Sequence, residues 1–184
     1  MIRTIALLAF VSVLAVTPAC KTAQTSTINS VHYDEQKNNT VLILLPYGNI
    51  TLPGKWKDQG ENSVSRQHYF SNEDSTTNIA VTKNPRRFYP FNQKQDSDQE
   101  FTHHFVAWDT AYFHETGRPT QIITDSSATT GFVLFDVSHP QSQSPKTTFL
   151  YGTKNGICYN LSGNSRKLTQ AEFQAFLIRL FYDN

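Results

Sequence analysis

Three histidines in one segment, His103, His104 and His114, are the first residues whose type suggests chemistry, because imidazole is a common zinc ligand. Two ligands on one helix converge when they are three or four residues apart. His103 and His104 instead diverge by about 100 degrees around a helix, and His104 and His114 lie about 15 Å apart along it. These histidines therefore predict no metal site, and the sequence indicates no cofactor.

Cys158 is a second candidate, because a thiolate can act as a nucleophile when a base and a positive environment activate it. Nothing near Cys158 resembles the signature of a cysteine hydrolase, and Ile157 and Tyr159 flank it in an expected strand. We therefore expect a buried, inert thiol. The chain also lacks a G-x-S-x-G nucleophile elbow. A serine and a histidine that meet only in the folded chain stay open, but the sequence favours a protein that is not an enzyme.

Cys20 follows a segment typical of an export signal. Arg3 gives a short positive region, residues 5–16 form a largely apolar run, and Ala19 places a small residue before the cysteine. The run is too short for a transmembrane helix, which needs about 20 apolar residues. The segment resembles the signal of bacterial lipoproteins, although Thr17 stands where such signals usually have leucine.

A lipid on Cys20 is the expected modification, with residues 1–19 removed as a signal peptide. The alternative is ordinary cleavage after Ala19 or Ala23, which would give a soluble periplasmic or secreted protein. A disulfide between Cys20 and Cys158 is less favoured, because it would tie a polar N-terminus to a core strand. The sequence thus predicts an exported protein of the cell envelope, held on the inner or outer membrane by the lipid on Cys20.

The net charge argues against one class of partner. Removing residues 1–19 takes away Arg3, so 16 Lys and Arg become 15, against 15 Asp and Glu. A formally neutral chain lacks the basic surface that neutralises phosphates, and we expect no nucleic acid partner. With 19 of 184 residues removed, the remaining 165 are enough for one domain with a single core.

The polar residues 20–39 predict a tether, and residues 40–184 predict the folded domain. Alternation and turn residues predict strands at residues 41–45, 49–52, 64–71, 78–82, 120–124, 131–138, 147–152 and 156–161. Within residues 96–115 a helical period places four aromatic residues on one stripe, namely Phe101, Phe105, Trp108 and Tyr112. Gly117 and Pro119 end this helix.

A second helix is predicted at the end of the sequence. Thr169 and Glu172 form a capping box at its start. Its apolar face carries Phe173, Phe176, Leu177 and Leu180. Residues 153–156, with the sequence TKNG, predict a hairpin, which indicates antiparallel pairing. The fold class is therefore α+β: a single layered domain with a largely antiparallel sheet of about seven or eight strands, packed against two amphipathic helices.

Residues 50–56, with the sequence ITLPGKW, are similar to the strand-Pro-Gly-x-Trp opening of PsbP/Mog1-type sandwich domains. The last hairpin and helix extend the resemblance through residues 149–152 (FLYG), 159–161 (YNL) and 176–177 (FL). The order of elements is compatible over residues 40–184. The family includes small exported lipoproteins, and the resemblance implies a scaffold used mostly for docking to other proteins, with no shared catalytic residues to transfer. The prolines and arginines of residues 84–92 depart from the family pattern.

That departing segment, NPRRFYPFN, is the candidate surface for binding a partner. It carries Arg86, Arg87, Phe88, Tyr89 and Phe91 beside two prolines, which indicate that it continues neither a strand nor a helix. Arginine and aromatic residues are enriched at interface anchors, and proline lowers the ordering cost of binding. The alternative is that Phe88 and Phe91 fold back as a lid over the core while the arginines stay solvated.

The sequence thus favours an exported, lipid-anchored protein that binds another envelope or secreted protein, as an assembly factor or as an immunity or inhibitor protein. The alternatives are an envelope hydrolase with a spatially assembled site and a carrier of a small ligand. A pocket with converging polar groups would favour one of these alternatives. A flat apolar or charged patch would favour the protein partner.

Overall fold

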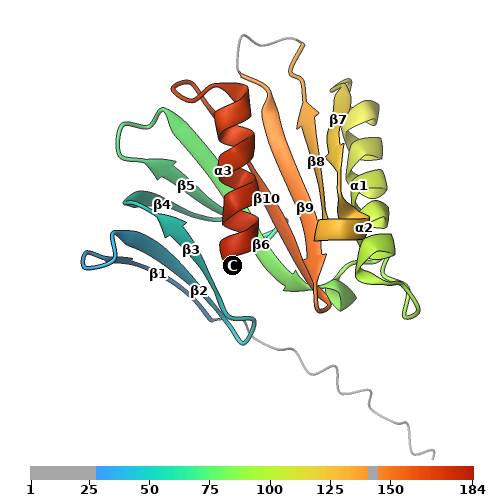
Figure 1. Cartoon of the computed structure of the whole chain (residues 1–184), viewed down its shortest axis with the longest axis horizontal. Helices are drawn as coiled ribbons and strands as arrows, with labels where there is room; N and C mark the ends of the chain where they lie inside the picture. The colour runs from blue at the N-terminus through green and yellow to red at the C-terminus, as the bar shows by residue number, and fades with distance from the viewer. Residues whose placement is uncertain (1–27, 141–144) are drawn as a thin grey trace, which may run out of the picture.

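The computed structural model describes residues 28–140 and 145–184. These residues form ten strands in two antiparallel sheets, together with three α-helices (Figure 1). The predicted α+β class is confirmed, and the larger sheet has seven strands. Cys20, the predicted lipidation site, lies outside the described residues.

The smaller sheet has the order β1-β2-β3 and consists of β1 (Ile28–Asp34), β2 (Asn39–Leu45) and β3 (Asn49–Pro53). The predicted tether is wrong for β1, which pairs along its whole length with β2. Its sequence INSVHYD is polar, and Val31 is its one hydrophobic residue packed against the core. Pairing with the apolar β2 therefore orders a segment whose own composition does not predict a strand.

The larger sheet has the order β4-β5-β6-β10-β9-β8-β7. Its strands are β4 (Trp56–Glu61), β5 (His68–Asn72), β6 (Thr77–Pro85), β7 (Thr120–Asp125), β8 (Phe132–Val137), β9 (Thr147–Lys154) and β10 (Ile157–Ser165). The sequence did not predict β4, because its residues WKDQGE are polar and lie mostly exposed at one edge. The expectation that residues 84–92 continue no strand is wrong for Asn84 and Pro85, which pair with Cys158 and Ile157 at the end of β6.

The predicted hairpin between β9 and β10 is present, and its turn has two residues. Lys154 pairs with Ile157, and the intervening Asn155 and Gly156 have φ angles of 52° and 73°. A turn with two positive φ angles matches the twist of the flanking strands, and asparagine followed by glycine adopts it readily. The hairpin sets the register of the two strands that lie beside each other at the centre of the larger sheet.

One face of the larger sheet packs against α3 (Gln170–Asp183) and the smaller sheet (Figure 1). The predicted capping box is present, since Thr169 Oγ1 accepts from Glu172 N and Glu172 Oε2 accepts from Thr169 N. The buried side chains of α3 are Phe173, Leu177, Leu180 and Phe181. Gly152 is required on β9, because a Cβ there would lie 2.6 Å from a ring carbon of Phe181.

The opposite face packs against α1 (Asp98–Glu115). Ser97 and Glu100 form a capping box at its start, and the helix ends before Gly117 as predicted. The short helix α2 (Ser127–Thr130) follows β7, and the 3-10 helix η1 (Arg86–Phe88) follows β6. The larger sheet thus lies between α1 on one side and α3 with the smaller sheet on the other.

The predicted aromatic stripe of α1 is only half buried. Phe101 and Phe105 are 0% and 3% exposed, whereas Trp108 and Tyr112 are 51% and 54% exposed. Phe113 is buried in their place on the side of the helix that meets the sheet. The second half of the stripe is therefore covered only in part, although the sequence predicted that the sheet would cover it.

Candidate functional site

The sheet face that packs against α1 changes character between β9 and β10. Strands β8 and β9 present apolar side chains on it, namely Val133, Phe135, Val137, Phe149 and Tyr151. Strands β10 and β6 present small or polar ones, namely Asn160, Ser162, Ala80, Thr82 and Asn84. Because α1 packs on β9, β8 and β7, we call that part the covered half and the part formed by β10 and β6 the open half.

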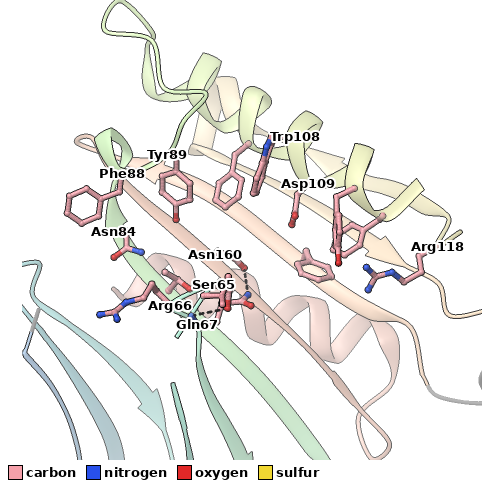
Figure 2. A pocket seen from close by; sticks show the side chains of 16 residues that line it. Ser65, Arg66, Gln67, Asn84, Phe88, Tyr89, Trp108, Asp109, Arg118 and Asn160 are labelled. Carbon is pink, nitrogen blue, oxygen red and sulfur yellow. Dashed lines mark hydrogen bonds between the residues drawn. The ribbon is translucent and has the colours of Figure 1, made fainter. Parts of the chain in front are cut away.

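A groove of about 520 Å³ lies over the open half. Its floor is formed by Thr82, Asn84 and Asn160 of the open half and, at the edge of the covered half, by Phe149. The α1 side is lined by Phe105, Trp108, Asp109, Tyr112, Phe113 and, after the helix, Arg118. Residues 64–67 line the opposite side, and Phe88 and Tyr89 close one end. Figure 2 shows Asp109 pointing from α1 toward the strands, with Asn84 and Asn160 facing it from the sheet.

The polar floor is shielded although no helix lies on it. Thr82 is 4% exposed and Asn160 is 9% exposed. Thr82 Oγ1 is buried without a hydrogen-bond partner among the described residues. Asn160 Oδ1 accepts one long hydrogen bond, at 3.3 Å, from Gln67 Nε2. Since buried polar groups in folded proteins are normally paired, this floor is under-bonded for its depth.

The wall opposite α1 is a tight turn. Asn62 Oδ1 accepts from the backbone amides of Val64 and Ser65, at 2.9 and 3.0 Å. Arg66 adopts a left-handed conformation with φ at 58°, and its Nε lies 2.7 Å from Glu61 Oε1. The strand predicted at residues 64–71 therefore begins later, and Val64 is 91% exposed at the rim of the groove rather than on a strand face.

Asp109 is the one carboxylate of the groove lining. Its Oδ2 accepts a hydrogen bond from the hydroxyl of the fully buried Tyr151, and no described residue donates to its Oδ1. Burial raises the pKa of Asp109, an effect that the Tyr151 bond and the charge of Arg118 reduce. Burial also raises the pKa of Tyr151 far above its usual range, with the negative charge of Asp109 adding to it.

Arg118 lies at the end of the groove away from Phe88 (Figure 2). Its guanidinium carbon is 5.3 Å from the ring centre of Tyr112 and 4.7 Å from that of Phe113. Its Nε donates to Thr116 Oγ1 at 3.0 Å. The aromatic rings and this hydrogen bond hold the guanidinium beside the groove without an ion pair to a described carboxylate.

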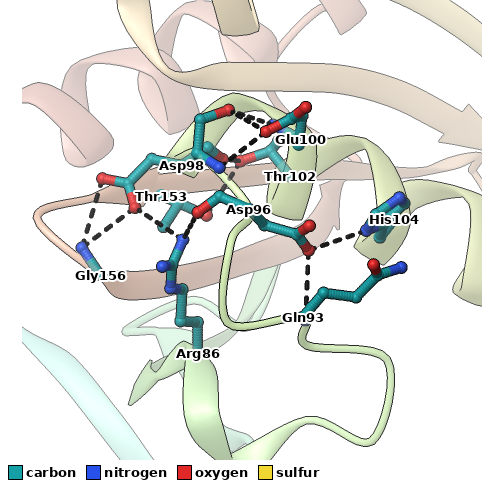
Figure 3. Close-up of polar contacts among 10 residues, drawn as sticks. Arg86, Gln93, Asp96, Asp98, Glu100, Thr102, His104, Thr153 and Gly156 are labelled. Atoms are coloured by element: carbon teal, nitrogen blue, oxygen red, sulfur yellow. Dashed lines mark hydrogen bonds and ion pairs between the residues drawn. The ribbon is translucent and has the colours of Figure 1, made fainter.

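The structure divides the five predicted partner-binding residues between two roles. Arg86 donates to the backbone carbonyl of Asp96 and lies 3.6 Å from Asp98, whose carboxylate accepts from the amide of Gly156 (Figure 3). This network ties the loop to the start of α1 and to the β9–β10 hairpin. The guanidinium of Arg86 is therefore engaged inside the protein.

Tyr89 and Phe91 fold back on α1, as the lid alternative expected of Phe91. The ring centre of Tyr89 is 4.8 Å from that of Phe105, and the ring of Phe91 is 5.4 Å from that of Trp108. Phe88 does not fold back and is 49% exposed. Arg87 is exposed as well, with its guanidinium 5.2 Å from the ring of Phe88. Arg87 and Phe88 thus remain at the surface, beside the groove.

A serine and a histidine do meet in the fold. Ser127 Oγ lies 2.8 Å from His103 Nε2, and Asp125 Oδ2 lies 3.0 Å from the same nitrogen. A hydrolytic triad needs the acid on the other ring nitrogen, so that the histidine can accept the proton of the serine. Here Ser127 donates to Asp125 Oδ1 at 2.7 Å, and the cluster fixes the start of α2 instead.

The remaining candidates have structural roles. His104 Nδ1 lies 3.0 Å from Asp96 Oδ2, and His114 Nε2 lies 2.7 Å from Thr120 Oγ1. Across residues 28–140 and 145–184, no group of three or more histidine, cysteine or acidic side chains is placed to hold a metal ion. Cys158 is buried as predicted, and its burial raises the pKa of the thiol.

Sequence reasoning missed the groove because its residues come from distant segments. The signal was nevertheless present in part: β6 and β10 alternate, with polar or small residues at every second position, including Thr82 and Asn160. Two strands with one polar face predict a surface that no helix covers. Only the sheet order, which places β6 beside β10, brings these faces together opposite Trp108 and Asp109.

No protein family model matches the chain. A comparison with curated proteins gives no match either. In the part of the chain that the structure describes, no helix has the length and apolar character that crossing a membrane requires.

Proposed function

We propose that the protein is an exported, lipid-anchored binding protein of the cell envelope, and that the groove over the open half is its recognition site. The observation that carries the proposal is the shielded, under-bonded polar floor, to which Thr82 and Asn160 belong. A concave site with a few converging polar groups and aromatic walls is the usual form of a ligand site. The aromatic wall is formed by the exposed parts of Trp108 and Tyr112.

The chemistry of the lining supports binding rather than catalysis. The lining contains neither histidine nor cysteine, and its charged residues are Arg66, Asp109 and Arg118. Arg66 is paired with Glu61, and Asp109 is held by Tyr151. A nucleophile activated by an adjacent base is therefore not assembled in the groove. The resemblance to PsbP/Mog1-type domains, which share no catalytic residues, agrees with a non-catalytic role.

The shape of the site favours a ligand that enters a groove over a folded partner that docks on a flat surface. The ligand-carrier alternative is thereby strengthened over the protein partner that the sequence favours. Arg87 and Phe88 stay the predicted contacts for such a partner, because both are exposed beside the groove. The export signal and the lipid on Cys20 supply the proposed location.

Photo-crosslinking in the native host tests the recognition site. A benzophenone amino acid replaces Val64 or Phe88 at the rim, and a control replaces Tyr182, which is 53% exposed on α3 at the opposite face of the sheet. Benzophenone couples to nearby C–H bonds, so a bound ligand of any organic class is captured. We expect adducts from both rim positions and none from the control.

Equal labelling at all three positions, or none at the rim, would contradict the proposal.

Intact-mass analysis of the same membrane fraction checks the anchor. The expected species begins at Cys20 and carries a diacylglycerol thioether on its sulfur. An unmodified sulfur, or retention of residues 1–19, would overturn the proposed location while leaving the groove result intact.

A further inference from the structure

The hydrogen-bonding groups of the groove floor are electrically neutral and of both kinds. Asn84 and Asn160 on the floor, and Gln67 on the wall beside it, each carry a carboxamide, which offers two donors and one acceptor oxygen, and Thr82 carries a hydroxyl. A metal ion would need several oxygen or nitrogen ligands with charge, and a phosphate would need several free donors or cations. The floor instead suits a ligand that both donates and accepts hydrogen bonds at several points.

The charged residues around the floor disfavour ions of either sign. Arg66 and Arg118 line the groove and oppose a cation, while Asp109 opposes an anion. The charge of Arg66 is compensated by Glu61 at 2.7 Å. Arg118 and Asp109 both lie on the α1 side of the groove, so a buried ligand charge that approaches one of them also meets the charge of the other, which has the same sign as its own. A neutral ligand avoids that cost.

Asp109 supplies one strong acceptor on the α1 wall. Tyr151 occupies its Oδ2, and its Oδ1 is left to a donor from the ligand. Trp108 and Tyr112 flank Asp109 along the same helix, and about half of each side chain is exposed. A ligand hydroxyl could donate to Asp109 while an apolar face of the same ligand packs on an aromatic ring.

From these features we infer that the groove binds a neutral oligosaccharide built from pyranose rings. A pyranose ring has C–H faces for Trp108 and Tyr112, and its equatorial hydroxyls both donate and accept toward Asp109 and the carboxamides. The inference rests on the proposed function, because it names the ligand of the same groove. The groove lies over the face of β6 and β10, whose backbones are paired with neighbouring strands. A peptide strand would therefore find no free sheet edge there.

Titration of the full mature protein tests the ligand class. The protein is extracted from membranes in an amine-oxide detergent, which carries no sugar headgroup, and is titrated with maltotetraose, cellotetraose and the tetramer of N-acetylglucosamine. We expect saturable binding of at least one of these by calorimetry, accompanied by a change in tryptophan emission. The chain has two tryptophans, and Trp56 lies on the α3 side against Phe176. Trp108→Phe should therefore remove the emission change.

Two variants test the named contacts. Trp108→Ala and Asp109→Asn should each weaken binding by about tenfold or more, which corresponds to losing one well-placed contact. Asp109→Asn retains an acceptor oxygen for Tyr151, so a loss of folding is not expected. Tyr182→Ala, at the opposite face, should bind as the wild type does. Melting curves of all variants separate lost binding from lost folding.

The outcomes are distinguishable. No saturation by any of the three sugars up to about 10 mM, beyond the range of the weakest specific sites, overturns the inference. Binding that both variants leave unchanged overturns it too. If benzophenone at position 64 or 88 still captures an adduct in cells, and protease digestion of that adduct leaves two peptides joined to each other, the groove recognises protein. The proposed function then stands and the saccharide inference fails. If neither experiment gives binding, both fail.

Discussion

The covered and open halves of the same sheet face behave in opposite ways. On β9, Phe149 and Tyr151 meet α1 in a dense aromatic cluster, whereas on the adjoining β10, Asn160 lies under a groove. The two strands are consecutive and are joined by a two-residue turn. The residue type at alternate positions of β10, and not the position of the strand in the sheet, therefore decides where helix coverage ends.

The same boundary explains why α1 exposes part of its aromatic stripe. Burying a large apolar side chain contributes about 1.5 to 3 kcal/mol, provided that it meets an apolar partner. Phe105 finds one in Tyr151, with ring centres 4.1 Å apart. Trp108 and Tyr112 face the open half, where Asn160 and Thr82 offer none. Burial of these rings would also strip water from the polar floor, which carries a cost of its own.

The largest expected effect comes from Phe135→Ala in the covered half. Phe135 is 0% exposed and stacks on Phe149 with ring centres 5.2 Å apart. Removing a fully buried phenylalanine ring costs about 3 to 5 kcal/mol, because a cavity adds to the lost transfer energy. Tyr69→Ala, on β5 beside the open half and 39% exposed, is the matched control. Urea unfolding measures both, and we expect less than about 1 kcal/mol for the control.

Comparable losses for the two variants would mean that the open half is packed as the covered half is. A small loss for Phe135→Ala would place the main stability of the fold on the α3 side alone. Either outcome would remove the distinction between the two halves.

Much of this architecture follows from local patterns, and the exceptions have physical causes. Alternation and turn residues predict β6, β8, β9 and β10, and the box of Thr169 and Glu172 predicts the start of α3. The segment β1 is polar, and its order comes from pairing with β2. The polar edge strand β4 similarly lacks the alternation that marks a half-buried strand. Such strands depend on partners that their own composition does not reveal.

The site was harder to predict because its residues acquire their roles from distant partners. Arg86 and Arg87 are adjacent and chemically identical, yet Asp96 and Asp98 engage the first and leave the second exposed. Local composition cannot separate them. Asp109 likewise becomes notable only once Tyr151, 42 residues away, donates to it. The sequence predicted an aromatic and arginine-rich surface near residue 88, but not the groove beside it.

A smaller effect is expected from two threonines that differ in bonding. Thr102 Oγ1 lies 2.8 Å from the carbonyl of Asp98 and 2.9 Å from Thr153 Oγ1 at the covered half. Thr102→Val leaves the hydroxyl of Thr153 without its partner and should cost about 1 to 3 kcal/mol. Thr82→Val in the open half loses no hydrogen bond and places a good strand former in β6. The free energy of unfolding of the Thr82→Val variant, measured in urea, should equal or exceed that of the wild type.

The comparison would be weakened if Thr82→Val destabilised the protein as much as Thr102→Val does. Such a result would show that Thr82 already has a partner in solution, and the floor would then be less open than its bonding indicates. Thr82→Ser keeps the hydroxyl and removes the methyl group, so it measures separately how much the packing of that methyl contributes.

The smallest effect concerns Asp109, at the boundary of the two halves, and depends on pH. Burial raises its folded pKa above the ordinary 3.8, so the folded state favours the protonated form. Its contribution to stability is therefore complete below pH 3.8 and is lost as the pH rises through the folded pKa. Asp109→Asn stays neutral throughout. The variant should gain stability relative to wild type as the pH rises from below 3.8 to neutral.

Asp74 serves as the control, because its pKa is shifted in the opposite direction to that of Asp109. The side chain is exposed, and hydrogen bonds from the hydroxyl and then from the amide of Thr76 lower its pKa to about 2. Its contribution is present above pH 3.8 and lost as the pH falls toward about 2. Asp74→Asn should therefore lose stability relative to wild type at neutral pH, where Asp109→Asn gains it. Unfolding free energies across the pH range measure both, and a loss for Asp109→Asn at neutral pH would show that its carboxylate is satisfied without a ligand.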